Sequence, residues 1–330
     1  MAETKAIRPE QILKELDDLW LTMGSADADS SDGVLRACAM TLIVCTDGAT
    51  DEVGETLAKL VRDHPARLIV LRLTDGPGNP GEASMAAGVV AQCWMPFGRK
   101  QQICCEQIEI AMTLAAVDGL APLVRGLLAP DLPVAIWCRG RTLVSHPQFQ
   151  PVLRLANKLI VDSSGGRDLA DRLALIRAAH DADTRVADLS WTRITRWRES
   201  VAAIFDSPVY LDRIATFDRA TLDYQGPHKP MAACYLSAWL QHCMGGQLTF
   251  EYRNSGDAPR ARLHRLTLSG GEICVSITVA LDQSVEMQSV RSSHTLFKPL
   301  SEYELMREEL KVLGEDPVYE AVLNLAPEFV

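Results

Sequence analysis

The sequence lacks the segments that carry a chain into or across a membrane. Its N-terminal stretch "MAETKAIRPEQILKELDDLW" has no apolar core of the kind that a secretory signal requires. No run of about 18 apolar residues occurs, because Asp118, Arg125 and Asp131 interrupt the longest apolar stretch. We therefore expect a cytoplasmic protein without a membrane span.

Basic residues are also scarce relative to acidic ones. The chain has 33 Lys and Arg against 43 Asp and Glu, a formal net charge of -10, and no block of five or more basic residues. Because such a chain repels polyphosphate, we do not expect it to bind nucleic acid. What remains is an ordinary globular composition: 47% of the residues are apolar, and 330 residues are enough for two domains with real cores.

The nine cysteines include no C-x-x-C pair, and most stand in apolar runs. This usage is typical of reduced core thiols in a cytosol. Cys104 and Cys105 are adjacent, and neighbours in a strand point to opposite faces, so they cannot pair without a strained turn. These two residues are the candidates for a redox-responsive thiol, with a structural role as the alternative. We expect no metal site, since Cys234, His242 and Cys243 diverge around a helix.

The common catalytic motifs are missing as well. The sequence contains no G-x-S-x-G, no G-x-x-x-x-G-K-[ST] and no H-E-x-x-H. "GPGNPG" (76–81) matches the dinucleotide fingerprint G-x-G-x-x-G, but Pro77 and Pro80 remove two N–H donors, and the segment that follows is too short for the required helix. We therefore predict no catalytic residues and no bound cofactor.

The first half of the chain alternates apolar runs with helical patterns. Nearly continuous apolar runs are typical of strands buried on both faces, which favours a mostly parallel sheet. The runs 88–97 and 101–110 are separated only by "GRK", so we expect an antiparallel hairpin there. The predicted strands are 39–45, 66–73, 88–97, 101–110, 130–138 and 158–164. One predicted helix ends near Val61, and the others cover about 113–128, 148–156 and 167–180.

The second half follows a polar stretch at 180–190 and has a different pattern. We predict a helix opening near Ser190, an extended segment at 208–217, a helix at 229–246, strands at 247–253, 262–269, 272–280 and 285–291, and helices near 301–312 and 317–324. The expected fold is an α/β N-terminal domain with a mostly parallel sheet plus an antiparallel hairpin, and an α+β C-terminal domain with an antiparallel meander. The predicted division is 1–34 (helical segment), 35–182 (α/β) and 183–330 (α+β).

A Ser-Gly turn follows the predicted strand 158–164. In "VDSSGGRDLADRL" (161–173), the turn lies where a strand ends and a helix begins, which is a natural place for an anion. Two flanking aspartates oppose that interpretation, and such turns are common as plain helix caps. The candidate anion-binding residues are Ser163, Ser164, Gly165 and Gly166.

Two tryptophans and three arginines stand in "DLSWTRITRWRES" (188–200). At about 100° per residue, the apolar residues from Trp191 to Phe205 form one helical face, so the tryptophans are chiefly core or interface residues. Arg198 falls within that face, where a buried guanidinium needs a carboxylate or a pocket. A structural ion pair and a binding anchor both remain open. The candidates for a partner-binding or interdomain surface are Trp191, Arg193, Arg196, Trp197 and Arg198.

Several segments together resemble the glucose-6-phosphate dehydrogenase assembly proteins, the OpcA family. The strongest are "LLAPDLPVAIWCRG" (127–140) and "DLSWTRITRWRESVAAIFD" (188–206). "CEQIEI" (105–110), "KLIVDSS" (158–164) and "YLSAWLQHCMGG" (235–246) stand with them in the family's order. One departure is Trp137-Cys138, where the family has a tryptophan pair.

This resemblance implies a non-catalytic protein that binds glucose-6-phosphate dehydrogenase, promotes its active oligomer and so supports NADPH production in the oxidative pentose phosphate pathway. Two other functions remain open from the residues alone. One is a sensor or enzyme for sugar phosphates that uses the 162–166 turn and an arginine from 193–198. The other is a structural component of a different complex.

Overall fold

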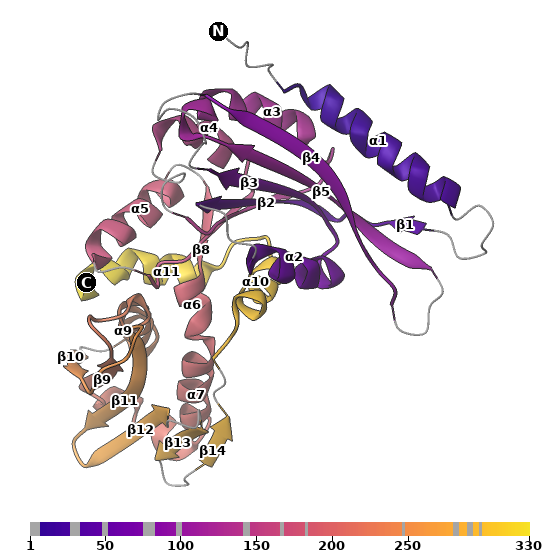
Figure 1. The fold of residues 1–330 in the computed structure, drawn as a ribbon. Helices are drawn as coiled ribbons and strands as arrows, with labels where there is room; N and C mark the ends of the chain where they lie inside the picture. Colours follow the sequence, from indigo (N-terminus) through magenta and orange to yellow (C-terminus); the bar gives the residue numbers. More distant parts are fainter. Residues whose placement is uncertain are drawn as a thin grey trace. The chain divides into compact units, whose positions relative to one another are not determined.

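A computed structural model gives the fold of the chain (Figure 1). It describes residues 7–26, 34–47, 52–74, 83–96, 101–140, 146–165, 168–181, 184–245, 248–279, 284–288, 293–296 and 299–330. The 76–81 loop and Gly166 lie outside these residues. The chain forms two compact units. Unit 1 comprises Met1–Val161, Ala182–Ala187 and Glu302–Gly314, and unit 2 comprises Asp162–Asp181, Asp188–Ser301 and Glu315–Val330. Each unit therefore combines separated stretches of chain, unlike the contiguous division predicted from the sequence.

Unit 1 is built on an eight-stranded sheet among the described residues, with the order β1-β5-β3-β2-β6-β7-β8 and β4 paired to β5. The pairings from β1 through to β7 in that order are parallel, whereas β4 and β5 are antiparallel. The mostly parallel sheet and its hairpin are thus confirmed. The strands are β1 (Val34–Arg36), β2 (Met40–Asp47), β3 (Ala66–Leu73), β4 (Met85–Trp94), β5 (Gln102–Met112), β6 (Val134–Cys138), β7 (Lys158–Val161) and β8 (Arg185–Asp188), whose last residue belongs to unit 2.

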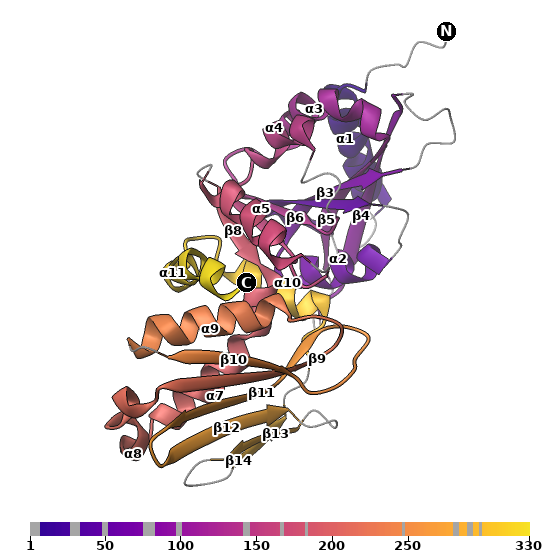
Figure 2. The same cartoon turned by 90° about the vertical axis from the view of Figure 1, so that its left-hand side faces the viewer.

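Helices cover both faces of this sheet. Figure 1 shows α1 along β4 and β5, and Figure 2 shows α2 on the opposite side. The central strands are consequently buried on both faces, which explains their continuous apolar sequences: Ile43, Leu68 and Ile69 are each fully buried. The helical segments of unit 1 are α1 (Pro9–Ala26), α2 (Glu52–Asp63), η1 (Leu114–Gly119), α3 (Leu120–Leu127), η2 (Pro147–Phe149), α4 (Gln150–Leu153) and α10 (Glu302–Lys311).

Helix α10 comes from the far end of the chain, yet it belongs to unit 1. The Lys158 ammonium at the start of β7 donates to Oε2 of Glu309 at 2.7 Å, to the Glu309 carbonyl at 2.9 Å and to the Val312 carbonyl at 2.9 Å. Arg139 makes a bidentate pair with Glu302 at 2.9 and 3.0 Å. Lys158 is 7% exposed, so these contacts are made largely out of water.

Unit 2 contains a second sheet with the order β10-β9-β11-β12-β13-β14 among the described residues. The predicted meander is right for the run from β11 to β13, whose neighbours are antiparallel, but wrong for the first predicted strand. That strand, β10, pairs in parallel with β9, which separates it from β11. The strands are β9 (Arg219–Gln225), β10 (Thr249–Asn254), β11 (Arg262–Gly270), β12 (Ile273–Val279), β13 (Ser284–Gln288) and β14 (Ser293–Leu296).

The helices of unit 2 include one that lies across this sheet, α9, as Figure 2 shows. It ends at Gly245, whose φ of 60° is the left-handed conformation that glycine adopts most readily. The predicted extended segment 208–217 is wrong, because it forms helical turns instead. The helical segments are α5 (Leu169–Asp181), α6 (Leu189–Arg193), α7 (Thr195–Phe205), α8 (Pro208–Leu211), η3 (Ile214–Thr216), α9 (Met231–Met244), α11 (Pro317–Leu325) and η4 (Ala326–Phe329).

Candidate functional site

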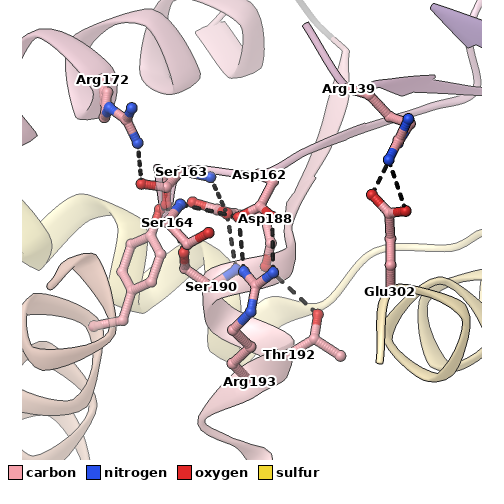
Figure 3. Close-up of polar contacts among 11 residues, drawn as sticks. Arg139, Asp162, Ser163, Ser164, Arg172, Asp188, Ser190, Thr192, Arg193 and Glu302 are labelled. Carbon is pink, nitrogen blue, oxygen red and sulfur yellow. Dashed lines mark hydrogen bonds and ion pairs between the residues drawn. The ribbon is translucent and has the colours of Figure 1, made fainter. Parts of the chain in front are cut away.

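The Trp/Arg stretch opens on a buried carboxylate, Asp188, which caps α6. Its Oδ1 accepts the backbone N–H groups of Ser190 at 2.9 Å and Ser163 at 3.0 Å, and its Oδ2 accepts the Tyr235 hydroxyl at 2.8 Å (Figure 3). Burial raises the pKa of Asp188, although the hydrogen bonds from Ser163 and Ser190 oppose that shift. Asp188 therefore ties α6 and α9 to the Ser-Gly turn.

The turn itself is held by a second carboxylate, Asp162. Arg193 of α6 makes a bidentate pair with Asp162, both distances being 2.7 Å, and the N–H of Ser164 donates to Asp162 Oδ1 at 2.9 Å (Figure 3). Burial alone would raise the pKa of Asp162, but the hydrogen bonds and charge of Arg193 outweigh burial and lower it. The Ser163 hydroxyl donates to the Ser190 hydroxyl at 2.9 Å.

The structure thus brings the turn and Arg193 together, the combination that the sugar-phosphate alternative from the sequence uses. It also shows what the first backbone donors of the turn contact: the N–H groups of Ser163 and Ser164 point at carboxylates of the protein itself. Gly165 is exposed at the end of the described turn. An external anion at these two N–H groups would have to displace Asp188 and Asp162. Anion binding at the turn stays a prediction.

The first tryptophan of the stretch, Trp191, is 3% exposed within unit 2. Its indole N–H donates to Asp316 at 3.0 Å, and its ring packs against those of Tyr235 and Tyr319 at centroid distances of 6.4 and 5.6 Å. The Arg198 guanidinium lies 3.7 Å from the Trp191 ring centroid. The sequence placed Arg198 within the apolar helical face, where its guanidinium needs a partner. In the structure, a cation-π contact with Trp191 meets part of that need.

The second tryptophan, Trp197, is 4% exposed. The stretch is not one continuous helix, since it breaks at Ile194 between α6 and α7, but Ile194 and Trp197 still face the core together. Arg193 and Arg196 are half-buried. Among the five partner-surface candidates, the two tryptophans are therefore core residues of unit 2, and the half-buried arginines are the ones that a partner could reach. Their role in partner binding stays a prediction.

A pocket of about 230 Å³ lies beside this stretch, entirely within unit 2. Arg193, Arg196 and Trp197 contribute to its wall from the helices, and Ser164 contributes from the turn. The remaining basic side chains of the wall are Arg262 and His264, at the start of β11. These two were missed from the sequence, where nothing local distinguishes them from other residues of an exposed strand end.

The adjacent cysteines lie in unit 1 and have different environments. Cys104 forms a disulfide with Cys93, which stands directly opposite on β4, so the expectation of reduced thiols is wrong for both of these cysteines. Cys105 is a free and buried thiol, and burial raises its pKa to about 11. A raised pKa leaves little of the reactive thiolate at neutral pH. A redox role for either residue stays a prediction.

Neither a metal-binding cluster nor a membrane-spanning helix is found among the described residues. No group of three or more His, Cys, Asp or Glu side chains in this part of the chain is placed to hold a metal ion. No helix in the same ranges has the length and apolar character needed to cross a membrane. The structural observations thus define a two-unit α/β chain whose polar cluster and basic pocket both lie in unit 2.

Sequence comparison gives the family. Residues 58–194 match the N-terminal domain of the family described as the glucose-6-phosphate dehydrogenase subunit, and residues 184–323 match the C-terminal domain of the same family. The two matches follow one another along the chain with an overlap at 184–194, and together they include most of it. The protein therefore belongs to the OpcA family of glucose-6-phosphate dehydrogenase subunits.

Similar curated proteins carry the same family name. The OpcA protein of Nostoc punctiforme, named for the OxPP cycle, is 28% identical over 61% of this chain, and that of Synechococcus elongatus is 28% identical over 62%. The aligned stretch spans only 42% and 45% of those two proteins, less than half of their length.

The solved structures that this chain resembles are distant. A myo-inositol 2-dehydrogenase from Lactobacillus plantarum has a TM-score of 0.46 and 10% identity, over 87% of this chain and 95% of its own. A biliverdin reductase from Synechocystis has a TM-score of 0.45 and 9% identity, over 87% of this chain and 96% of its own. Likenesses of this size say nothing about activity.

Proposed function

We propose that this protein binds glucose-6-phosphate dehydrogenase and favours the active oligomer of that enzyme without catalysing a reaction itself. The observation that carries the proposal is family membership, because both matched domains belong to a family described by that enzyme's name and extend through both units. The polar side chains around Asp188 in unit 2 support a non-catalytic role, since Asp188, Ser163 and Ser190 are 0%, 4% and 1% exposed and so have little surface to offer a substrate.

Such a protein can act by mass action alone. If it binds the active oligomer more tightly than the inactive or dissociated forms, it shifts their populations by no more than the difference in binding free energy. A preference of about 3–5 kcal/mol is enough to convert a mostly inactive population into a mostly active one. A few well-placed arginine contacts can supply that preference.

The test is to titrate purified glucose-6-phosphate dehydrogenase of the same organism with this protein at sub-saturating substrate. We expect a saturable rise in kcat/KM together with a larger species in size-exclusion chromatography. The informative variant is Arg196→Ala, because this side chain is half-buried on α7 rather than in the core. Arg253→Ala is the matched control, since Arg253 is exposed on β10 and pairs only locally with Glu251 at 2.8 Å.

Loss of both activation and the larger species in Arg196→Ala, with both kept in Arg253→Ala, would support a docking surface on α7. Trp197→Ala is less informative, because removing a side chain that is 4% exposed perturbs folding first. If the wild-type protein forms no complex with the enzyme and leaves its kinetics unchanged, the proposed function is wrong.

A further inference from the structure

The unit 2 pocket has a wall of unusual charge for this protein. The chain carries a net charge of -10, yet the described residues that line the pocket include Arg193, Arg196, Arg262 and His264, and no Asp or Glu. These four basic residues come from the α6–α7 stretch and from β11, more than 60 positions apart in the sequence. The fold, rather than a local run of basic residues, therefore concentrates positive charge at this place.

The arginines of the wall differ in how their charges are balanced. Arg193 is neutralised by its bidentate pair with Asp162. Arg262 instead donates through Nε and Nη2 to the amide oxygen of Gln225, at 3.1 and 2.8 Å. An amide oxygen carries no net charge, so these bonds orient the Arg262 guanidinium while leaving its positive charge in place. An anion entering the pocket would meet the oriented N–H donors that these bonds leave over, two on Nη1 and one on Nη2 of Arg262.

The first turn of α9 adds further donors to the same wall. Met231 and Ala232 line the pocket, and the capping residue before them, Pro230, makes no side-chain hydrogen bond to this end of the helix. The first N–H groups of a helix have no intrahelical partner and carry a partial positive charge. Helix α9 has 14 residues, which is long enough for that partial charge to develop. This end of the helix acts together with the arginines and not as a site by itself.

Apart from Ser164 and Ser190, the rest of the wall is apolar. Ile194, Trp197 and Leu263 are buried side chains that face the pocket. They would contact the body of a ligand whose charged group lies against the arginines. The volume of about 230 Å³ is below the ~300–1,000 Å³ typical of pockets for drug-sized ligands, so a whole dinucleotide does not fit.

We propose that this pocket binds a small phosphate monoester, with the phosphoryl group directed at Arg262 and the first turn of α9. A phosphate monoester carries nearly two negative charges and three acceptor oxygens at neutral pH. Three oxygens in a tetrahedral arrangement can be met by donors from several elements, whereas a carboxylate offers two oxygens in one plane. The sequence offered the 162–166 turn as a candidate anion site, and the pocket proposed here adjoins that turn, with Ser164 in its wall.

The experiment is isothermal titration calorimetry of the full chain, with glucose 6-phosphate as the probe, glucose as its neutral counterpart and inorganic phosphate as the bare anion. We expect saturable binding of glucose 6-phosphate, weaker binding of inorganic phosphate and none of glucose. Arg262→Gln should weaken glucose 6-phosphate binding by about tenfold or more, because it removes a charged donor. Arg265→Gln is the matched control: this exposed arginine lies on the same strand, bonds to Thr278 and does not line the pocket.

His264→Gln provides a second variant on the pocket wall, so that the test does not depend on the folding of one protein. Circular dichroism and thermal melting establish that each variant is folded before titration. The proposal is overturned if no phosphate ester binds at millimolar concentration, if glucose binds as well as its phosphate, or if folded Arg262→Gln and His264→Gln both bind like Arg265→Gln. Because the titration contains no dehydrogenase, its outcome is independent of the proposed partner function.

Discussion

Replacing Asp188 tests whether the buried carboxylate organises unit 2 through hydrogen bonds. In Asp188→Ala, the N–H groups of Ser163 and Ser190 and the hydroxyl of Tyr235 all lose their acceptor. Each unpaired buried donor costs about 1–3 kcal/mol, and water entering the space left by the carboxylate recovers part of the total. We therefore expect unit 2 to lose about 3–5 kcal/mol of unfolding free energy, a fall in Tm of roughly 10 °C.

Asp188→Asn is the matched control, because an amide oxygen can still accept both N–H groups while the charge is gone. We expect its unfolding free energy to lie within about 1 kcal/mol of the wild-type value. The attraction between the carboxylate charge and the N–H dipoles is lost, but a neutral amide costs less to bury than a carboxylate. Thermal melts followed by circular dichroism and tryptophan fluorescence measure both variants. The hydrogen-bond reasoning is refuted if Asp188→Asn is as destabilised as Asp188→Ala, or if Asp188→Ala has the same Tm as the wild type.

The pH dependence of the same pair checks the electrostatics. Because the pKa of Asp188 is raised in the folded chain, the folded state keeps a proton that the unfolded chain has already released. Wild-type stability should fall as pH rises from the ordinary carboxyl pKa through the folded-state pKa, and Asp188→Asn should lack this loss. The lowered pKa of Asp162 acts oppositely, with stability lost as pH falls, but it is present in both proteins and largely cancels in their difference.

Two further predictions concern unit 1 and the cysteines. Lys158→Met should lower the unfolding free energy of unit 1 by about 2–4 kcal/mol in urea unfolding, because Glu309 and Val312 lose a buried charged donor. An unchanged urea midpoint would mean that contacts other than those of Lys158 hold α10 in place. In iodoacetamide labelling at pH 8 read by peptide mass spectrometry, the exposed Cys274 should react well before Cys105, whose buried thiol has a pKa of about 11; equal rates would contradict the burial of Cys105.

The sheet of unit 1 was predictable because its strands are buried on both faces and read as uninterrupted apolar runs. The short strands β1 and β8 of this sheet were missed, and the other errors in secondary structure lie in unit 2. Strand β9 has the sequence "RATLDYQ", in which only Ala220, Thr221 and Leu222 are buried, too short a run and with a polar residue at its centre, so it does not stand out as a strand. The segment 208–217 contains β-favouring residues, but Pro208 occupies the first turn of a helix and only Tyr210 and Phe217 are buried.

The candidate site was predictable only in part, for a related reason. The residues from Asp188 to Arg198 form one conspicuous local stretch, and their amphipathic face is visible in the sequence. The other side of the pocket is formed by Arg262 and His264 on β11, which meet the helices only in the folded unit. Likewise, the partner of Cys104 is set by the register of β4 on β5, and a pairing register is not legible from an isolated run of residues.

The path of the chain through the two units limits how the protein can be divided. Strand β8 through Ala187 and helix α10 belong to unit 1, while residues on either side of each belong to unit 2. No single cleavage therefore releases either unit whole: a cut at 182/183 removes α10 and most of β8 from the unit 1 sheet, and it separates α5 from the rest of unit 2. Half-length fragments should be poor substitutes for the intact chain in expression trials, and surface loops such as the one between β10 and β11 are better places for a tag.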